Sequence, residues 1–260
     1  MYINKTFERI IVNEIDTRFP AKKVGKPRIF STNYVVDRII KVLRTGMQWS
    51  ELEVNCGKPK TIYNLFNKYI NDGIFERCYK KVLNLYYNRR GKISFFHATD
   101  TSFVKNIFGI DLLGRNPTDR GRNASKLSVI VDDNGVVFSL DFHEANKNDC
   151  TLLGNVLDKF IIKTKTKKVK FYADKAYDTK NCREQIGKYK YINCVSRKGF
   201  NESHKEKYRY IVEHSFSWLD LYRRLIVRYE KKIKTYREFT FLALFIITSR
   251  KILKYFKKMK

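Results

Sequence analysis

Three carboxylates, Asp100, Asp174 and Glu213, are the residues of this sequence best suited to chemistry. Asp100 falls within a strand-like run, Asp174 follows another, and Glu213 lies on a helix-like run. The chain around them is strongly basic, with 54 Lys and Arg against 26 Asp and Glu and a formal net charge of +28. Carboxylate oxygens are the ligands that Mg²⁺ and Mn²⁺ prefer, and a pair of such ions can activate a nucleophile and stabilise the leaving oxygen at a phosphate. The combination predicts a metal-dependent enzyme that cuts or joins nucleic acid.

The excess of positive charge favours a polyanionic partner, because each phosphate that a cation neutralises releases counterions. A merely basic or ribosome-associated protein is the alternative. A membrane partner is not expected, since the cations are spread along the chain. The five cysteines are far apart and form no C-x-x-C pair, which disfavours disulfides and zinc and fits a reducing compartment. We therefore expect a cytoplasmic protein that acts on chromosomal DNA, or a nuclear one in a eukaryotic host.

The elements before residue 90 are expected to be helical and to form a small domain of their own. Apolar residues follow helix spacing from Tyr34 to Arg44, and Gly46 is a plausible stop. A second helical stretch opens at Pro59, and a third follows Gly73. Three short helices with basic outer faces suggest a helix-turn-helix-like DNA-binding or assembly domain over residues 1–90. A purely structural bundle is an equal alternative.

Beyond residue 90 the apolar period changes to that of strands and predicts an α/β domain over residues 91–260. The predicted strands are residues 95–104, 126–132, 136–142, 169–173 and 191–195, with a hairpin turn at residues 133–135. The predicted helices are residues 149–161 and 178–186, a long helix from about residue 208, and a buried helix near the carboxyl end. This order of elements predicts a mixed sheet flanked by helices. Asp174 would then stand at the carboxyl end of a strand, where such sheets place their ligands.

The predicted long helix places Glu213 on a charged stripe opposite its apolar face. Arg209, Arg224 and Arg228 lie on the same stripe. The simplest alternative is a solvated helix in which Arg209 and Glu213 form an ordinary i,i+4 pair worth a few tenths of a kcal/mol. That alternative is weaker for Asp100, because a charge within a strand, beside apolar residues on the same face, is costly unless it is paired or bound to a metal.

Several segments together resemble transposases of the DDE class from insertion sequences, in the IS-five-like branch. The matching segments are residues 42–52 (VLRTGMQWSEL), 61–66 (TIYNLF), 73–75 (GIF), 98–102 (ATDTS), 114–122 (GRNPTDRGR), 173–178 (ADKAYD) and 212–216 (VEHSF). The resemblance implies an RNase H-like mixed sheet flanked by helices and preceded by a small all-helical amino-terminal domain. It also implies that Asp100, Asp174 and Glu213 are the catalytic residues and hold two Mg²⁺ or Mn²⁺ ions.

The activity implied by the resemblance is cleavage of double-stranded DNA at terminal inverted repeats, followed by strand transfer into target DNA. Cutting two ends together implies a homodimer in a synaptic complex. The expected phosphate contacts are Arg209, Arg224, Lys175, Arg120, Arg122 and Arg228.

The chain departs from the family pattern at three positions. Ala176 replaces a glycine, Glu206 a tyrosine and Asp220 a lysine. Two alternatives to the transposase therefore stand: a catalytically impaired, transposase-derived DNA-binding protein, and a structure-selective endonuclease on the same fold.

Overall fold

The computed structural model describes residues 3–21, 25, 27–91, 94–162, 168–200 and 208–258. Its contacts divide the chain into two compact units, which we name the helical unit and the sheet unit. The helical unit comprises Met1–Tyr86, Leu219–Ile226 and Lys234–Lys260, and the sheet unit comprises Tyr87–Trp218 and Val227–Ile233. This division differs from the expected split at residue 90, because the carboxyl-terminal stretch groups with the amino-terminal helices.

The amino-terminal helices begin and end at local signals in the sequence. They are α1 (Lys5–Arg18), α2 (Thr32–Thr45), the 3₁₀ turn η1 (Trp49–Glu51), α3 (Pro59–Asn71) and α4 (Ile74–Arg90). The Ser31 hydroxyl accepts the N–H of Tyr34 at the start of α2, and Gly46 ends that helix at a φ of 72°. Pro59 occupies the first turn of α3, where its missing N–H costs nothing.

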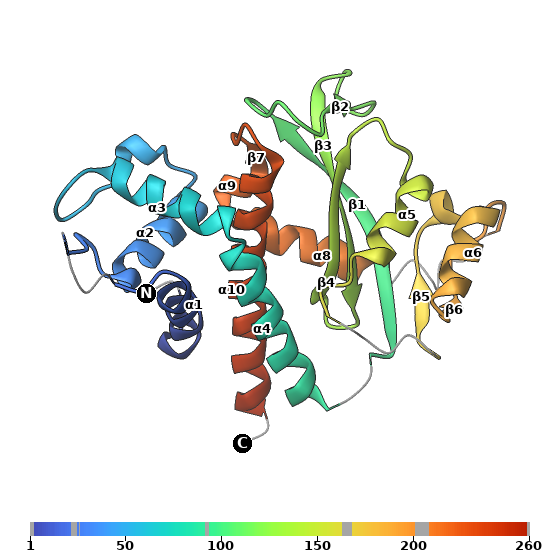
Figure 1. Cartoon of the computed structure of the whole chain (residues 1–260). Coiled ribbons are helices and arrows are strands. Elements are labelled where there is room, and N and C mark those ends of the chain that lie inside the picture. Colours follow the sequence, from blue (N-terminus) through green and yellow to red (C-terminus); the bar gives the residue numbers. More distant parts are fainter. Residues whose placement is uncertain are drawn as a thin grey trace. The chain divides into compact units, whose positions relative to one another are not determined.

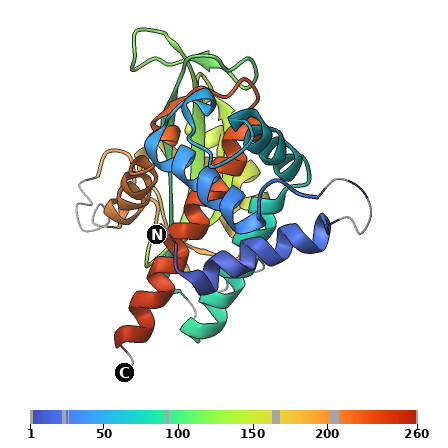
Figure 2. The ribbon, with the colours of Figure 1, turned by 90° about the vertical axis from the view of Figure 1, so that its left-hand side faces the viewer.

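Helix α10 (Ile233–Lys258) completes the core of the helical unit, together with the short α9 (Arg223–Ile226). The ring of Phe239 stacks on Phe66 of α3 with centroids 4.5 Å apart, and Phe245 meets Phe7 of α1 edge-on at 6.5 Å. These aromatic contacts explain why the carboxyl-terminal stretch joins the amino-terminal helices. Figure 2 looks onto the blue helices α1 and α2, with α10 in red. Within the described residues, none of the helices combines the length and the apolarity that crossing a membrane requires.

The sheet unit is built on three long antiparallel strands extended by two parallel ones (Figure 1). The long strands are β1 (Phe96–Asn106), β3 (Asn123–Asp132) and β4 (Val137–Glu144). β3 pairs antiparallel with both β1 and β4, whereas β5 (Lys170–Tyr172) pairs parallel with β1 and β6 (Ile192–Asn193) parallel with β5. The short strands β2 (Gly114–Arg115) and β7 (Val227–Arg228) pair with β3 and β1. This is the strand order of an RNase H-like sheet, so the expected fold class is confirmed.

The turn between β3 and β4 forms at the predicted Asp-Asn-Gly sequence. Gly135 takes a φ of 69°, which glycine adopts at little cost, and its N–H donates to the Asp132 carbonyl at 2.8 Å. The Asp132 carboxylate accepts the N–H of Val136 and pairs with Arg90 at 2.9 Å. The Ser215 hydroxyl on α8 (Arg209–Asp220) donates to the Gly135 carbonyl at 3.0 Å. The turn thus ties together the hairpin, the end of α4 and α8.

Short helices follow strands β4 and β5 along the chain. They are α5 (Asp149–Asp158), which follows β4, the 3₁₀ turn η2 (Lys175–Tyr177) and α6 (Lys180–Lys188). The predicted long helix from residue 208 is wrong in extent, because α8 ends at Asp220 and is followed by α9 and β7. The helical period continues in the sequence past Asp220, but the chain breaks there to pair Val227 and Arg228 with the end of β1. The expected charged stripe is therefore interrupted after Asp220.

Candidate active site

The pairing of two parallel strands brings Asp100 and Asp174 to the same level of the sheet. Ala98 in β1 pairs with Tyr172 in β5, and each acid stands two residues beyond its member of that pair. Asp100 lies opposite Val129 of β3, within the sheet. Asp174 leaves the end of β5 and caps η2, where its Oδ1 accepts the N–H of Ala176 at 2.8 Å. The local fold therefore places two carboxylates side by side from segments far apart in the sequence.

Burial and a neighbouring negative charge act together on Asp100. Burial raises the pKa of Asp100, and Asp174 raises it further, to about 6. A hydrogen bond from the Thr101 N–H at 2.8 Å and the charge of Arg209 lower the pKa, but they do not compensate. A carboxyl group that holds its proton this far above its usual range, with a second acid beside it, is typical of a functional site.

Arg209 links Asp100 to Glu213. Its Nη2 atom lies 3.7 Å from Asp100 Oδ2 and 3.9 Å from Glu213 Oε1, so the two oxygens are separated by no more than the sum of these distances. Both contacts are longer than a charge-assisted hydrogen bond. The Nε atom of Arg209 is buried and has no hydrogen-bond partner in the described part of the chain. The Glu213 side chain is 61% exposed and free to turn on the surface of α8.

The three acids have the chemistry of a divalent-metal site. They offer only hard oxygen donors, and Asp100 lacks full compensation of its charge. The guanidinium of Arg209 already occupies a position where two carboxylates stabilise a cation. Among the described residues, however, no three acidic, histidine or cysteine side chains stand at metal-ligating spacing. The donor set thus fits Mg²⁺ or Mn²⁺ in type and charge, and Glu213 would have to swing away from Arg209 to join Asp100 and Asp174.

A fourth carboxylate supports the site and was not among the expected site residues. Asp149, at the start of α5, accepts the Thr101 hydroxyl at 3.0 Å and pairs with Lys126 at 2.7 Å. Lys126 is buried on β3 and also donates to the carbonyl of Lys147 at 2.7 Å. A lysine at the start of the predicted strand 126–132 was the signal available in the sequence, because a buried ammonium needs an acid partner.

Tyr177 lies in the middle of this group of acids. Burial raises the pKa of its phenol well above the usual value, and the charges of Asp100, Asp149 and Asp174 raise it further. A phenol so placed stays protonated. Its ring is fully buried in η2.

Two of the expected phosphate contacts are structural instead. Arg228 is completely buried, and its five N–H groups donate to Asp111, Ser125 and backbone carbonyls. A guanidinium with every donor used inside the protein cannot reach a phosphate, so the expectation for Arg228 is corrected. Arg224 is nearly buried in the helical unit, where it donates to the Met47 carbonyl at 3.2 Å. Its expected place near the acids depended on the continuous helix that the structure breaks.

The remaining expected contacts are on the surface of the sheet unit. Lys175 follows Asp174 directly and is exposed. Arg120 and Arg122 are exposed on the loop between β2 and β3, where Arg120 has a φ of 51°. Only Lys175 and Arg209 adjoin the acids in sequence or by contact.

The departures from the family pattern can be placed in part. Ala176 contributes its backbone N–H to Asp174, which any residue but proline can do, and its φ is not positive. The change from glycine therefore leaves the cap of η2 intact. Asp220 is exposed at the last position of α8. Glu206 lies outside the described residues.

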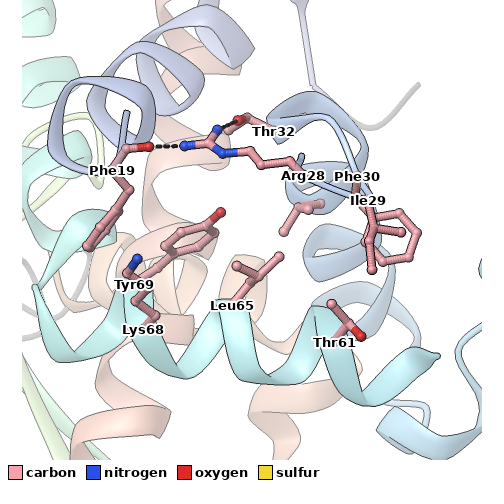
Figure 3. A pocket seen from close by; sticks show the side chains of 10 residues that line it. Phe19, Arg28, Ile29, Phe30, Thr32, Thr61, Leu65, Lys68 and Tyr69 are labelled. Carbon is pink, nitrogen blue, oxygen red and sulfur yellow. Dashed lines mark hydrogen bonds between the residues drawn. The ribbon is translucent and has the colours of Figure 1, made fainter. Parts of the chain in front are cut away.

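A pocket of about 240 Å³ lies in the helical unit (Figure 3). Apolar and aromatic side chains line most of it, including Leu65 and Tyr69. Arg28 crosses one side and donates to the Thr32 hydroxyl at 3.0 Å and to the Phe19 carbonyl. Burial raises the pKa of Tyr69 to about 12. The pocket holds no carboxylate and none of the expected site residues.

Comparison with known proteins identifies the family of the chain. Residues 111–247 match a family model described as "Transposase DDE domain", and residues 10–79 match "Putative transposase of IS4/5 family". The first match includes Asp174 and Glu213 and starts after Asp100. A putative transposase for insertion sequence element IS402 from Burkholderia cepacia is 34% identical over 127 residues, which span 46% of this chain and 60% of that relative.

Solved structures of the Mos1 transposase show a much weaker likeness. A paired-end complex with the left transposon end covers 88% of this chain and 81% of its own, at 11% identity and a TM-score of 0.28. A pre-cleavage transpososome, at 11% identity, covers 88% and 80% with a TM-score of 0.29. Likeness at this level carries no argument, so the assignment rests on the sequence matches. By those matches, this chain belongs to the DDE transposase family of insertion sequences.

Proposed function

We propose that this protein cleaves DNA at the terminal inverted repeats of a mobile element and joins the freed ends to target DNA. The observation that carries the proposal is that Asp100 is linked to each of the other two acids, to Asp174 through the paired strands and to Glu213 through Arg209. Asp100 and Asp174 leave paired strands at the same level, and one guanidinium nitrogen lies within 4 Å of both Asp100 and Glu213.

Asp100, Asp174 and Glu213 would hold two Mg²⁺ or Mn²⁺ ions. When bound, such ions polarise the phosphate and lower the pKa of a coordinated water or hydroxyl. Asp100 must lose its proton to take part, and Arg209 must release the two carboxylates. Arg209 then remains beside the acids, where its planar donors can contact a phosphate oxygen of the cut strand. Lys175 supplies a second cation next to Asp174.

The reaction consists of two displacements at phosphorus. In the first, water breaks a phosphodiester bond at the element's end and leaves a 3′ hydroxyl. In the second, that hydroxyl attacks a phosphodiester of target DNA, and the target's own 3′ oxygen leaves. The site needs no covalent enzyme intermediate for either step. The acids and the neighbouring cations of the site would hold the charges of the reacting groups, with the buried Tyr177 beside them.

The helical unit would recognise the terminal repeats or assemble the synaptic complex, and two copies of the chain would hold two DNA ends together. The expectation rests on the basic outer faces of α2, α3 and α4 and on the need to cut both ends in one complex. The match of residues 10–79 to an IS4/5-family transposase model supports a role for this unit in transposition.

The test is nicking of a duplex that carries the inverted repeats flanking the coding region, in Mg²⁺ or Mn²⁺. We expect the unaltered protein to nick at the repeat end and to yield joined products with a target plasmid. Asp174→Ala should abolish both while DNA binding persists, whereas Glu184→Gln on the exposed face of α6 should change neither.

Other outcomes would identify a different protein. Tight binding without nicking by the unaltered protein would contradict the enzyme and support a DNA-binding descendant of a transposase. Nicking without any joined product would support an endonuclease.

A further inference from the structure

The loop that follows β1 presents large apolar side chains to solvent. Ile107, Phe108 and Ile110 are 53%, 60% and 71% exposed. Tyr229, just after β7, is 42% exposed, and its ring lies 6.2 Å from that of Phe108. We name these four residues the apolar tip; it follows the end of β1, near β7 in Figure 1. Exposed apolar residues in a contiguous group usually mark an interaction site.

The apolar tip is held in place by buried polar groups and is not a loose loop. The N–H of Ile107 donates to the Arg228 carbonyl at 3.0 Å, and that of Ile110 to the Lys231 carbonyl at 2.9 Å. The guanidinium of Arg228 also binds the carboxylate and carbonyl of Asp111. Gly109 packs so closely on Asn106 and Arg228 that a Cβ atom would clash there. The completely buried Arg228 therefore holds in place a loop whose apolar side chains are exposed to solvent.

Cations predominate among the exposed charges of the segments that contain the apolar tip and its neighbours in sequence. In residues 105–123 and 227–233, every charged side chain in the exposed class is a cation. These cations are Lys105, Arg115, Arg120, Arg122, Lys231 and Lys232. Of the three acids in the same segments, Glu230 is buried, Asp119 is half-buried, and Asp111 is paired with Arg228 with its side chain 42% exposed. We name these six cations the basic rim. Apolar side chains with such cations in the same segments match a duplex whose stacked bases lie between two rows of phosphates.

We propose that the apolar tip is a wedge that inserts into duplex DNA and bends it, while the surrounding cations hold the phosphates. The proposal rests on the proposed function only in taking DNA as the partner. Apolar side chains inserted between base steps unstack them and kink the duplex, and the bend brings more protein surface into contact. A second copy of the chain fits the tip less well, because two basic rims would repel each other.

Asp100 lies on β1, and the apolar tip follows the end of that strand. Asp100 and Asn106 are six residues apart in β1, which corresponds to about 20 Å, or roughly six base pairs of duplex. A bend at the tip would therefore act on the same DNA segment that passes the acids.

The experiment uses a 30-base-pair AT-rich duplex with a donor and an acceptor fluorophore at its ends, in EDTA so that no cutting occurs. The test variant combines Phe108→Ala and Ile110→Ala, both on exposed side chains that the fold does not need. The matched control is Phe95→Ala, an aromatic side chain that is 75% exposed at the opposite end of β1. Anisotropy gives the affinity, energy transfer gives the bend, and 2-aminopurine in the duplex reports unstacking.

We expect the unaltered protein and Phe95→Ala to bend the duplex and to raise 2-aminopurine fluorescence equally. The double variant should bind about tenfold more weakly, the scale of one lost aromatic contact to a base, and should leave the duplex nearly straight. Equal binding and bending by the double variant would overturn the wedge. So would loss of self-association in sedimentation with DNA binding unchanged, which would assign the tip to a second copy. Nicking is scored separately in Mg²⁺: bending without nicking supports the wedge and counts against the proposed transposase activity.

Discussion

Each unit of the molecule contains a carboxylate in a largely buried position, and the two are treated in opposite ways. Glu14 in the helical unit is met by Arg77, whose Nε lies 2.9 Å from its Oε1, and by Lys81. Burial raises the pKa of Glu14, but hydrogen bonds from the two cations outweigh burial and lower it. Asp100 in the sheet unit has another carboxylate for a neighbour and a cation only at 3.7 Å, and its pKa is raised to about 6.

The difference shows that Glu14 stabilises the fold, whereas Asp100 has an uncompensated charge that a bound cation could neutralise. Glu14 has its counter-charges built in, so the folded protein gains from its ionisation. Asp100 is ionised at neutral pH at the expense of stability, which a bound cation would relieve. The arginines divide in the same way, since Arg228 uses all its donors inside the protein and Arg209 keeps long contacts to two acids.

The largest effect is expected at the buried arginine. Arg228→Ala should lower the free energy of unfolding of the sheet unit by about 3–5 kcal/mol, because it leaves Asp111 and several carbonyls without donors. Arg209→Ala should change it by less than about 0.5 kcal/mol. Urea unfolding followed by circular dichroism gives both values. Similar losses in the two variants would erase the distinction between the arginines.

Glu14→Gln tests the satisfied acid. The substitution removes a charge-assisted partner from Arg77 and Lys81 and should destabilise the helical unit by about 2 kcal/mol at pH 7. The loss should shrink as the pH falls toward the range where Glu14 itself takes up a proton, because its lowered pKa makes its contribution disappear in acid. A loss that does not change with pH would show that the ion pairs are not its cause.

Asp149→Asn tests the contribution of Asp149, which accepts a hydrogen bond from Thr101 next to Asp100 and pairs with Lys126. It keeps an acceptor for Thr101 but leaves the buried Lys126 without a counter-charge, and we expect nicking to slow about tenfold, as for outer partners of metal ligands. The charge of Asp149 raises the pKa of Asp100, so its removal should move the acidic limb of the pH–rate profile to lower pH. A slower reaction with an unmoved limb would indicate a merely structural role.

The smallest expected effect is a gain, not a loss, in the free energy of unfolding. Asp100→Asn should stabilise the metal-free protein at pH 7.5 by about 1 kcal/mol, because it removes a charge whose burial is uncompensated. Since the folded pKa of about 6 lies above the unfolded value of 3.8, the folded protein binds more protons between these values. The contribution of Asp100 to the stability of the unaltered protein therefore declines as the pH rises from about 4 to about 6, and the gain in the variant should vanish near pH 4. Thermal melts in EDTA at both pH values check this.

The fold could be predicted from the sequence wherever a local signal sets an element. Gly46, Pro59 and the turn at Gly135 define helix and hairpin boundaries through their own backbone preferences. The end of α8 could not be predicted, because apolar residues continue at helix spacing past Asp220 while strand pairing of β7 with β1 overrides them. Which unit α10 joins depends on ring contacts between residues more than 170 positions apart, such as Phe66 with Phe239.

The three acids of the candidate site could be singled out from the sequence because each stands in, at the end of, or on a periodic run. Their support could not be, since the partnership of Lys126 with Asp149 and the place of Tyr177 depend on contacts across the sheet. Arg228 was assigned to the surface by its position on a helix that does not extend so far. Sequence periodicity therefore fails mainly for buried charged residues, such as Lys126 and Arg228, which it assigns to the surface or leaves unassigned.

Binding of Mn²⁺ in the absence of DNA tests the central claim most directly. Electron paramagnetic resonance counts free and bound ions, and we expect the unaltered protein and Glu184→Gln to bind Mn²⁺ with equal affinity. Asp100→Asn and Asp174→Asn should each weaken that binding by at least about tenfold. Binding that is unchanged in both variants would show that these acids do not hold the metal, and the proposed site would be wrong.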